Sequence, residues 1–479
     1  MKRYSIYILI LIITGITSCK KGFLDIEDPN GPAKTTPDKM LTNVLRQALE
    51  LQATAGLPTS TITQQLATSR LTTPNVDNWV DLGAVNYEFQ NNYFFVASNN
   101  EAMMQWATEE GSFAYVGIGK LIKALCYAYT TDLFGEVYYD EANKEIAQPK
   151  FNTQDYVYQQ ILGLIDDAEQ QFDKPSFRTV GDEDIFYGGD LNKWKKFGFA
   201  LKARLLNHLS KKPNYNPQEV LSLIDKSFQD RSGEPIFIYP GPYPDAHPWS
   251  PDGNLPSSAK TWNKYFVNLL NGEGMNGVRD PRLEKIVNPG SDGVYRGVTN
   301  GITKDGLNPE LIGSLWGKFY TSENSEYCLL TFDELKFIEA EAAFRTGDKM
   351  RAHTAYKSAI TNNLQRMGVG IAEQNTYMQS AAVAQNPASL SLKDIMIGKY
   401  ISLVFQPEIW VDMRRMDYSP QIYPGLAQPP GANPALKGAW VRRLPPFSTE
   451  IDYNKAQVEA IGGLAPDYTG KKVWWDSAN

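Results

Sequence analysis

Residues 340–360, AEAAFRTGDKMRAHTAYKSAI, carry the pattern that decides the predicted fold. Gly347 lies five residues before Ala352, and Tyr356 and Ala359 follow Ala352 by four and seven residues. Tetratricopeptide repeats show this spacing around their second helix: a glycine occupies the turn between two helices, small alanines lie where the helices touch, and an aromatic ring fills the remaining gap. The segment therefore predicts a helical hairpin of this repeat type.

Helical spacing of apolar residues recurs over much of the chain. The periodic segments are residues 37–52, 101–133 (broken near Gly111), 154–172, 191–210, 217–228, 331–360 and 391–406. The helix pairs within 102–172 and 191–228 are candidates for degenerate copies of the same repeat, because stacked copies bury a continuous core. We therefore expect a mainly α fold, a tetratricopeptide-repeat-like scaffold of about four helix pairs.

Residues 231–317 differ from the helical segments in composition. They contain 10 Pro and 13 Gly, about 26% of the stretch, against about 14% for the whole chain. The string YPGPYP at 239–244 is incompatible with a helix interior, because proline lacks the backbone N–H and clashes with the preceding turn. We expect loops and short turns here, laid over the helical scaffold, and a loop-rich ligand-binding region.

The first residues have the features of a bacterial lipoprotein signal. Lys2 and Arg3 precede an apolar run from Tyr4 to Ile16, and small residues lead to Cys19. The run of about 13 residues is shorter than the roughly 20 that a membrane-spanning helix needs. Cleavage before Cys19 and its acylation would give a lipid anchor. An ordinary signal peptide or an N-terminal anchor helix, with a chance cysteine, is the alternative. The expected segments are a signal peptide (1–18), a lipidated tether (19–38) and a single domain (39–479) with the loop-rich insertion at about 231–317.

Composition and charge limit the classes of function that are possible. The chain has a net charge of −7 and no basic block, which argues against nucleic acid as a partner. Cys126 and Cys328 each lie in or beside an apolar stretch, so we expect buried free thiols, with a disulfide as the alternative. Aromatic residues make up 12% of the chain, with 10 Trp and 26 Tyr, and favour a ligand whose faces stack on rings.

The sequence offers few groups for catalysis or metal binding. No HExxH, CxxC or GxSxG string occurs, and none of the three histidines has a neighbour at metal-ligand spacing. His208 and His353 lie in helical segments, where packing or the surface is the expected place. Asp166 and Asp167 are expected on a solvated helix face. A glycosidase needs two carboxylates about 5–10 Å apart across a cleft, and proximity in sequence does not supply this arrangement. We therefore expect no catalytic residue, no metal and no cofactor.

Other acidic groups have structural interpretations. Glu339 and Glu341 are expected to pair with Arg414 or Arg415 as a charged clamp between helices. The loop 181–190, GDEDIFYGGD, is expected to be a flexible acidic loop. Bound calcium is the alternative for this loop, which lacks the spacing of an EF-hand.

Capture of a sugar requires a rigid aromatic surface edged by hydrogen-bonding groups, because apolar sugar faces stack on Trp and Tyr. The candidates outside the strongest helical patterns are Trp79, Tyr87, Trp249, Trp262, Tyr295, Trp316 and Tyr320. Buried packing is the alternative role for each of them. We assign Trp106, Trp194 and Trp410 to the core, and we expect Trp474 and Trp475 to anchor the C-terminus.

Short motifs occur in order along most of the chain. They are Cys19 followed by FLD at 23–25, LFGEVYY at 133–139, WKKF at 194–197, LKARL at 201–205, TFDEL at 331–335, EAEA at 339–342, EIWVDMRR at 408–415, RRLP at 442–445, Glu450 and Asn454. Each motif alone is weak. Their order and spacing together resemble the SusD/RagB family of outer-membrane nutrient-binding lipoproteins.

This resemblance implies a helical fold with about four tetratricopeptide units, a loop-rich second half, and a position at the outer face of the outer membrane. Asp25, Glu27 and Asp28, soon after Cys19, are similar to the family's surface-export signal. The resemblance also implies that the protein caps a SusC-like TonB-dependent transporter and passes captured oligosaccharide inward, with a peptide as the alternative ligand. No run of aromatic residues matches a starch-binding arc, so the resemblance does not specify starch.

Two other classes of function stay open from the sequence. A surface glycosidase would need a carboxylate pair facing the aromatic loops. A structural assembly factor built on tetratricopeptide repeats would hold a partner protein in its groove and would have no small-ligand site. We favour a non-enzymatic binding module anchored at the cell surface.

Overall fold

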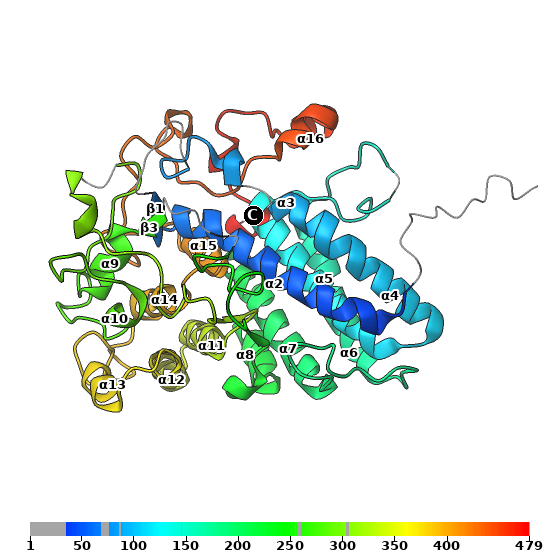
Figure 1. Cartoon of the computed structure of the whole chain (residues 1–479), viewed down its shortest axis with the longest axis horizontal. Coiled ribbons are helices and arrows are strands. Elements are labelled where there is room, and N and C mark those ends of the chain that lie inside the picture. Colours follow the sequence, from blue (N-terminus) through cyan, green and yellow to red (C-terminus); the bar gives the residue numbers. More distant parts are fainter. Residues whose placement is uncertain are drawn as a thin grey trace, which may run out of the picture. The chain divides into compact units, whose positions relative to one another are not determined.

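Helices dominate the described part of the chain (Figure 1). The computed structural model describes residues 35–68, 76–85, 88–144, 146–253, 255, 260–302 and 306–478. The α-helices are α2 (Pro37–Ile62), α3 (Glu88–Asn91), α4 (Ser98–Glu110), α5 (Phe113–Phe134), α6 (Gln154–Phe172), α7 (Leu191–His208), α8 (Pro217–Lys226), α9 (Lys264–Leu270), α10 (Leu283–Ile286), α11 (Phe332–Thr346), α12 (Lys349–Arg366), α13 (Ile371–Met378), α14 (Leu392–Ser402), α15 (Glu408–Arg415), α16 (Ser448–Tyr453) and α17 (Lys455–Ala460). The strands are β1 (Leu66–Thr68), β2 (Ile236–Ile238), β3 (Lys260–Trp262) and β4 (Glu326–Cys328). The predicted signal peptide and Cys19 lie outside the described residues.

The repeat-like sequence at 340–360 falls on α11 and α12, which lie side by side (Figure 1). Gly347 ends α11 with φ = 84°, a left-handed conformation that favours glycine. Ala352 and Ala359 are fully buried, and Tyr356 is 2% exposed. The Tyr356 ring reaches α14, where a Cβ on Gly398 would lie 3.5 Å from it. The predicted helical hairpin is confirmed.

The remaining helices extend this arrangement as a series of neighbours. Contacts join α4 to α5, α5 to α6, α6 to α7, α7 to α8, α8 to α11, and α11 to α14, while α2 packs against α4 and α5. The predicted break lies at Gly111, which ends α4 with φ = 82°. The predicted periodic segments are helical over most of their length, so the mainly α, tetratricopeptide-like fold is confirmed.

The largest error in a predicted helix boundary is at the end of α2. The expected helix at 37–52 continues as α2 to Ile62, through Gly56 and Pro58, two residue types that disfavour a helix interior. Most side chains in this last part are buried. Tertiary packing therefore overrides the local propensity of the residues.

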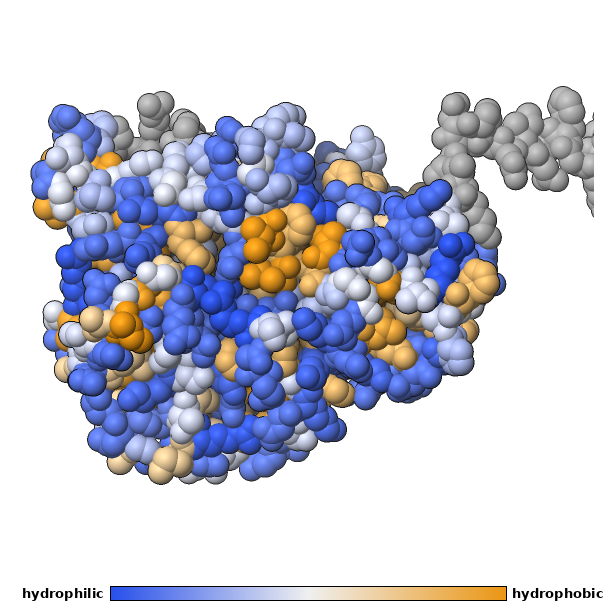
Figure 2. Space-filling model, turned by 60° about the horizontal axis from the view of Figure 1, so that its bottom comes forward, coloured by the Kyte–Doolittle hydropathy of each residue, from blue (hydrophilic) through white to orange (hydrophobic). Residues whose placement is uncertain are grey.

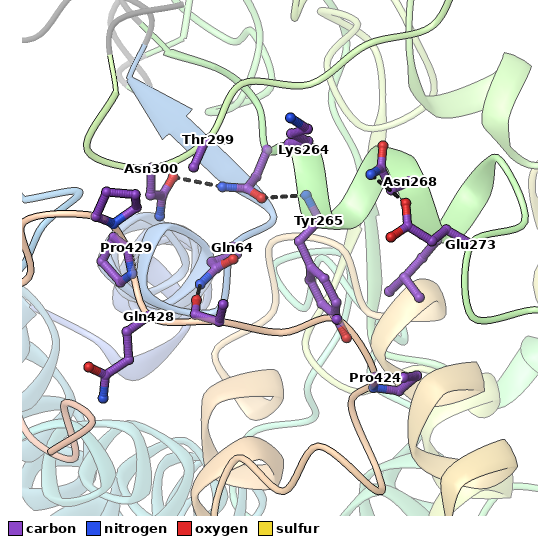
Figure 3. Close-up of a pocket in the computed structure, with 15 residues that line it drawn as sticks. Gln64, Lys264, Tyr265, Asn268, Glu273, Thr299, Asn300, Pro424, Gln428 and Pro429 are labelled. Atoms are coloured by element: carbon purple, nitrogen blue, oxygen red, sulfur yellow. Dashed lines mark hydrogen bonds between the residues drawn. The ribbon is translucent and has the colours of Figure 1, made fainter. Parts of the chain in front are cut away.

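Residues 231–317 contain short elements joined by turns, as expected. β3 pairs with β1 in antiparallel fashion, with Leu66 opposite Trp262, and β2 pairs with β4. The indole of Trp249 stacks on Phe405 with ring centres 4.0 Å apart, and Trp262 stacks on Phe405 at 5.3 Å. This stack joins the loops to the segment between α14 and α15. Figure 3 shows α9 of this region beside the chain segment that carries Pro424 and Pro429.

One face of the described residues is largely polar. In the view of Figure 2, hydrophilic residues cover most of the face and hydrophobic residues gather in small patches. None of the described helices is both long enough and apolar enough to cross a membrane.

The interior confirms most of the residues that we assigned to it. Cys126 and Cys328 are buried free thiols. Trp194 and Trp410 are fully buried, but Trp106 is only half-buried, so its assignment to the core was wrong. The buried face of α4 carries Asn100, Met103 and Ala107, and Trp106 points about 100° away from Ala107 around the helix.

The C-terminal tryptophans anchor the chain end, as predicted. Trp475 is fully buried and its Nε1 donates to Asp132 Oδ1 at 2.7 Å. The Trp474 ring packs against Tyr158 with centres 5.7 Å apart.

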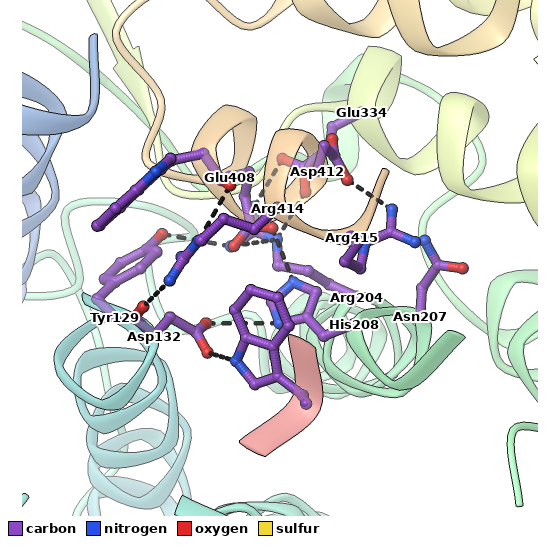
Figure 4. A network of polar contacts seen from close by, with 12 residues as sticks. Tyr129, Asp132, Arg204, Asn207, His208, Glu334, Glu408, Asp412, Arg414 and Arg415 are labelled. Carbon is purple, nitrogen blue, oxygen red and sulfur yellow. Dashed lines mark hydrogen bonds and ion pairs between the residues drawn. The ribbon is translucent and has the colours of Figure 1, made fainter. Parts of the chain in front are cut away.

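A cluster of buried ions joins the helices in the core (Figure 4). Arg204 of α7 makes two hydrogen bonds to Glu334 of α11, at 2.6 and 2.7 Å. Arg415 of α15 donates to Glu341 of α11 at 2.7 and 2.8 Å and to Asp412 at 2.6 Å. These side chains are at most 5% exposed. The predicted clamp between helices is therefore confirmed for Glu341 and Arg415.

The two other residues of the predicted clamp have different partners. Glu339 accepts hydrogen bonds from Lys336 at 2.8 Å and from Arg351 at 2.7 Å. Arg414 donates to the backbone carbonyl of Asp132 at 2.6 Å. Neighbouring residues of a helix point about 100° apart, so Arg414 faces the end of α5 while Arg415 faces α11.

His208 of α7 lies between two carboxylates in the same cluster. Its Nε2 lies 2.8 Å from Glu408 Oε2. Tyr158 donates its single hydroxyl proton to Asp132 Oδ1 at 2.6 Å, so it accepts from His208 Nδ1 at 2.8 Å. Both ring nitrogens then carry a proton. Burial alone would lower the pKa of His208, but Glu408 and Asp132 outweigh it and raise the pKa to about 9.

We predict that stability falls between pH 6.5 and 9. The native state keeps the His208 proton up to about pH 9, whereas the unfolded chain releases it near 6.5. The native state therefore binds more protons in this window, and roughly 3 kcal/mol of stabilisation, complete below pH 6.5, is lost as pH rises. Urea unfolding midpoints across the window measure this loss.

The matched pair for this test is His208→Gln and His353→Gln. His208→Gln removes the pH dependence and lowers stability, because it leaves buried carboxylates without their cation. His353 is a second buried helix histidine, whose Nε2 lies 2.8 Å from the carbonyl of Ala384, and its variant keeps the wild-type slope. An unchanged pH dependence in His208→Gln contradicts the assignment.

Candidate ligand-binding pocket

A pocket of about 340 Å³ opens beside α9 (Figure 3). We call it the α9 pocket. Three stretches far apart in sequence line it: Gln64 just after α2, residues 263–300 around α9, and residues 424–430. Its side chains combine amides, a phenol and several prolines. Its lining residues are Gln64, Asn263, Lys264, Tyr265, Asn268, Leu269, Glu273, Thr299, Asn300, Pro424, Gly425, Ala427, Gln428, Pro429 and Pro430.

A chain of amide hydrogen bonds fixes one side of the α9 pocket. Asn263 caps α9: its Oδ1 accepts from the backbone N–H of Tyr265 at 2.7 Å. The Asn263 Nδ2 donates to Asn300 Oδ1 at 2.8 Å, and Asn300 Nδ2 donates to the carbonyl of Thr61 in α2 at 2.7 Å. The loop around Asn300 is thereby tied both to α9 and to the end of α2.

The segment 424–430 forms the opposite wall. Gln64 Nε2 donates to the carbonyl of Ala427 at 2.5 Å and holds this segment against α2. Gly301 has φ = 76°, and a Cβ there would lie 2.7 Å from the carbonyl oxygen of Pro430, so only glycine fits this close approach. The wall presents proline rings, which are compact apolar surfaces.

The rim of the pocket is polar and carries one charge of each sign. Asn268 is half-buried, and its Nδ2 donates to Glu273 Oε2 at 2.6 Å. Lys264 and Glu273 are exposed. Amide and hydroxyl donors next to apolar walls are the groups that bind the hydroxyls and the apolar faces of a sugar.

Three of the predicted aromatic candidates are buried instead of facing a ligand. Trp79 is 1% exposed and packs against Trp440 with ring centres 5.3 Å apart. Trp249 and Trp262, 0% and 1% exposed, form the stack on Phe405. Their expected role as an exposed stacking surface is corrected: packing in the core covers both faces of these rings.

Among the described residues, the remaining candidates are not part of the lining of the α9 pocket. Tyr295 is half-buried, with the Arg279 guanidinium 5.0 Å above its ring. Tyr320 is half-buried and donates its hydroxyl to the carbonyl of Ser402 at 3.2 Å. Trp316 lines a shallow hollow of about 520 Å³, the Trp316 hollow, with Pro240, Pro242, Pro251 and residues 321–324. Tyr87 lies outside the described residues.

Reasoning from sequence missed the residues of the α9 pocket because it followed aromatic rings. Gln64, Asn263, Asn268 and Asn300 are polar residues scattered along the chain, and only the fold brings them together. One signal was present: asparagine precedes an apolar run in TWNKYFVNLL at 261–270, which is typical of a helix N-cap. The proline-rich segment 424–430 carries no local signal that it forms a pocket wall.

Two acidic clusters of the described residues contain groups that are hydrogen-bonded within the protein. Asp132, His208 and Glu408 lie close enough to share an ion, but the imidazole carries a proton on each nitrogen, and a protonated nitrogen is not a metal ligand. In the loop 181–190, the Asp184 carboxylate accepts from Trp194 Nε1 at 2.8 Å and from three backbone N–H groups. N–H donors therefore occupy the oxygens of Asp184, the buried carboxylate of this loop, which calcium would otherwise bind.

The comparisons with known proteins identify the family. The chain matches the SusD-like_2 family model, described as "Starch-binding associating with outer membrane", over residues 29–443. None of the curated proteins matches it.

Solved structures share the fold over almost the whole chain. A SusD/RagB family protein from Bacteroides thetaiotaomicron is 20% identical with a TM-score of 0.75, and the match covers 93% of this chain and 100% of that one. A SusD homologue from Bacteroides fragilis is 18% identical with a TM-score of 0.76, with coverage of 93% and 100%. A chitin-binding SusD homologue from Flavobacterium johnsoniae is 20% identical with a TM-score of 0.76, with coverage of 92% and 99%. The family match extends over most of the chain, and this protein therefore belongs to the SusD-like family of outer-membrane-associated proteins.

Proposed function

We propose that this protein is a cell-surface lipoprotein that binds an oligosaccharide in the α9 pocket and delivers it to a SusC-like TonB-dependent transporter. The observation that carries the proposal is the lining of the pocket, in which amide groups surround proline and tyrosine surfaces. These groups match the alternating hydroxyls and apolar faces of a sugar ring. The family description and the chitin-binding relative make starch and chitin fragments the first ligands to test.

The pocket supports binding without catalysis. Among the described residues that line it, Glu273 is the one carboxylate, and Asn268 already donates to it. Hydrolysis of a glycoside needs a pair of carboxylates on opposite sides of the bond. A non-enzymatic receptor is therefore the function that this pocket favours.

The Trp316 hollow is a second candidate surface for a longer ligand. Trp316 is half-buried beside Pro240 and Pro251, and the polar residues 321–324 lie at its edge. An indole with a partly open face offers the stacking contact that the buried tryptophans do not. We propose that sugar units beyond those in the α9 pocket stack here.

We predict that the full-length protein is retarded in native gels that contain soluble starch or glycol chitin. Asn268→Ala removes an amide from the rim of the α9 pocket, and it weakens retardation by about tenfold in apparent affinity, as expected for one lost hydrogen bond. Trp316→Ala weakens it only for long chains. Native affinity electrophoresis at several polysaccharide concentrations measures both effects.

The matched control for the rim variant is Asn362→Ala. Asn362 is a half-buried asparagine of α12 that bonds to Ser358 within its own helix, and its loss leaves binding unchanged. No retardation with any glycan, together with thermal stabilisation by peptides, would favour a peptide receptor. Release of reducing ends by the protein would contradict a non-enzymatic role.

Anchoring and partnership give a separate prediction. In cells, Cys19→Ser abolishes incorporation of labelled palmitate and releases the protein from the membrane fraction, because Cys19 is the proposed acylation site. Affinity purification of the wild-type protein from detergent-solubilised outer membranes recovers a TonB-dependent transporter. Label retained in the Cys19→Ser protein, or purification without a transporter, contradicts the respective part of the proposal.

A further inference from the structure

One polar group that lines the α9 pocket has no hydrogen-bond partner among the described residues. The hydroxyl of Tyr265 is fully buried and unpaired, and the residue as a whole is 9% exposed. Its ring extends from the start of α9 toward Pro424 (Figure 3). A buried hydroxyl without a partner destabilises the protein, and a ligand that pairs with the hydroxyl would recover this loss.

The position of this hydroxyl is fixed by its surroundings. The backbone N–H of Tyr265 donates to the Asn263 cap at 2.7 Å, and the ring packs against Tyr400 with centres 5.7 Å apart. Tyr400 itself is satisfied, because its hydroxyl donates to the carbonyl of Thr63 at 3.0 Å. The hydroxyl of Tyr265 therefore lacks a hydrogen-bond partner among the described residues, whereas the hydroxyl of the neighbouring Tyr400 has one.

The pocket wall lies beside the same ring without crowding it. Gly425 has φ = 80°, and a Cβ added there would lie 4.0 Å from Tyr265 Cε2, an ordinary van der Waals distance. Burial raises the pKa of Tyr265, so the phenol stays neutral and keeps its proton for donation. A neutral phenol both donates and accepts, which are the capacities of a sugar hydroxyl.

We propose that Tyr265 is a specificity-determining residue whose hydroxyl forms a hydrogen bond with a hydroxyl of a neutral sugar unit in the α9 pocket. This inference rests on the proposed function. A site built to hydrogen-bond a ligand hydroxyl discriminates strongly against ligands that lack it, because the buried protein group is then left unpaired. The prolines and amides supply general affinity for sugars, and Tyr265 selects among them.

The test compares Tyr265→Phe with Tyr127→Phe in the full-length protein. Tyr127 is the matched control: its hydroxyl is also buried and unpaired among the described residues, but it lies in α5 and does not line the pocket. Calorimetric titration with maltohexaose and with N-acetylchitohexaose gives the affinities. We expect Tyr265→Phe to bind about tenfold more weakly than wild type and Tyr127→Phe to bind as wild type does.

Thermal unfolding of the free proteins separates recognition from a structural role. Neither variant loses a hydrogen bond within the protein, so both melt at or above the wild-type temperature. The rise in melting temperature on adding saturating sugar shrinks in Tyr265→Phe alone.

Three results would overturn the inference. Wild-type affinity in Tyr265→Phe shows that the hydroxyl does not contact the ligand. A lower melting temperature of free Tyr265→Phe with unchanged affinity assigns the hydroxyl a structural role. Absence of binding by the wild-type protein to both sugars overturns the proposed glycan function, and this inference with it.

Discussion

The fold depends on buried charges that must neutralise one another. Ionised groups removed from water are costly, and attraction in the interior compensates only when each charge meets an opposite one with good geometry. In the cluster of buried ions that joins the helices of the core, the formal charges balance when His208 carries its proton. The acidic members are Asp132, Glu334, Glu341, Glu408 and Asp412, and the basic members are Arg204, His208, Lys399, Arg414 and Arg415.

The pairing of these buried charges fixes the relative positions of the helices that carry them. The ten side chains come from α5, α7, α11, α14 and α15, and a slip of any one helix would separate a buried charge from its partner. Apolar packing tolerates many arrangements of similar volume, whereas paired charges accept few. The C-terminus joins the same cluster through Trp475 and Asp132, so the end of the chain closes the helical core.

The fixed helices position the α9 pocket although loops build it. The carbonyl of Thr61 near the end of α2 accepts from Asn300, and Gln64 lies just after the helix. The segment between α14 and α15 supplies Phe405, on which Trp249 and Trp262 stack. Loops held at both ends by a rigid scaffold keep binding groups in place while their sequences vary. The role of the buried tryptophans is thus to hold the binding loops against the scaffold.

The sequence was sufficient to predict the helical scaffold, but it was insufficient to predict which residues form the α9 pocket. Gly347, Ala352 and Tyr356 carry a periodic signal that reports a helical hairpin directly, because neighbours along a helix are also neighbours in sequence. The α9 pocket joins Gln64 to residues near 263 and 428, and no local pattern reports contacts over such separations. Tryptophan in a loop was interpreted as a ligand surface, but a large ring between loops and helices also buries the most area, and that contribution dominates at Trp249 and Trp262.

The most direct test of this account is a crystal structure of the protein with a bound hexasaccharide of starch or chitin. The account predicts sugar density between α9 and residues 424–430, with a sugar hydroxyl within hydrogen-bonding distance of the Tyr265 hydroxyl. Density confined to the Trp316 hollow or to the helical face, with the α9 pocket free of sugar, would contradict it.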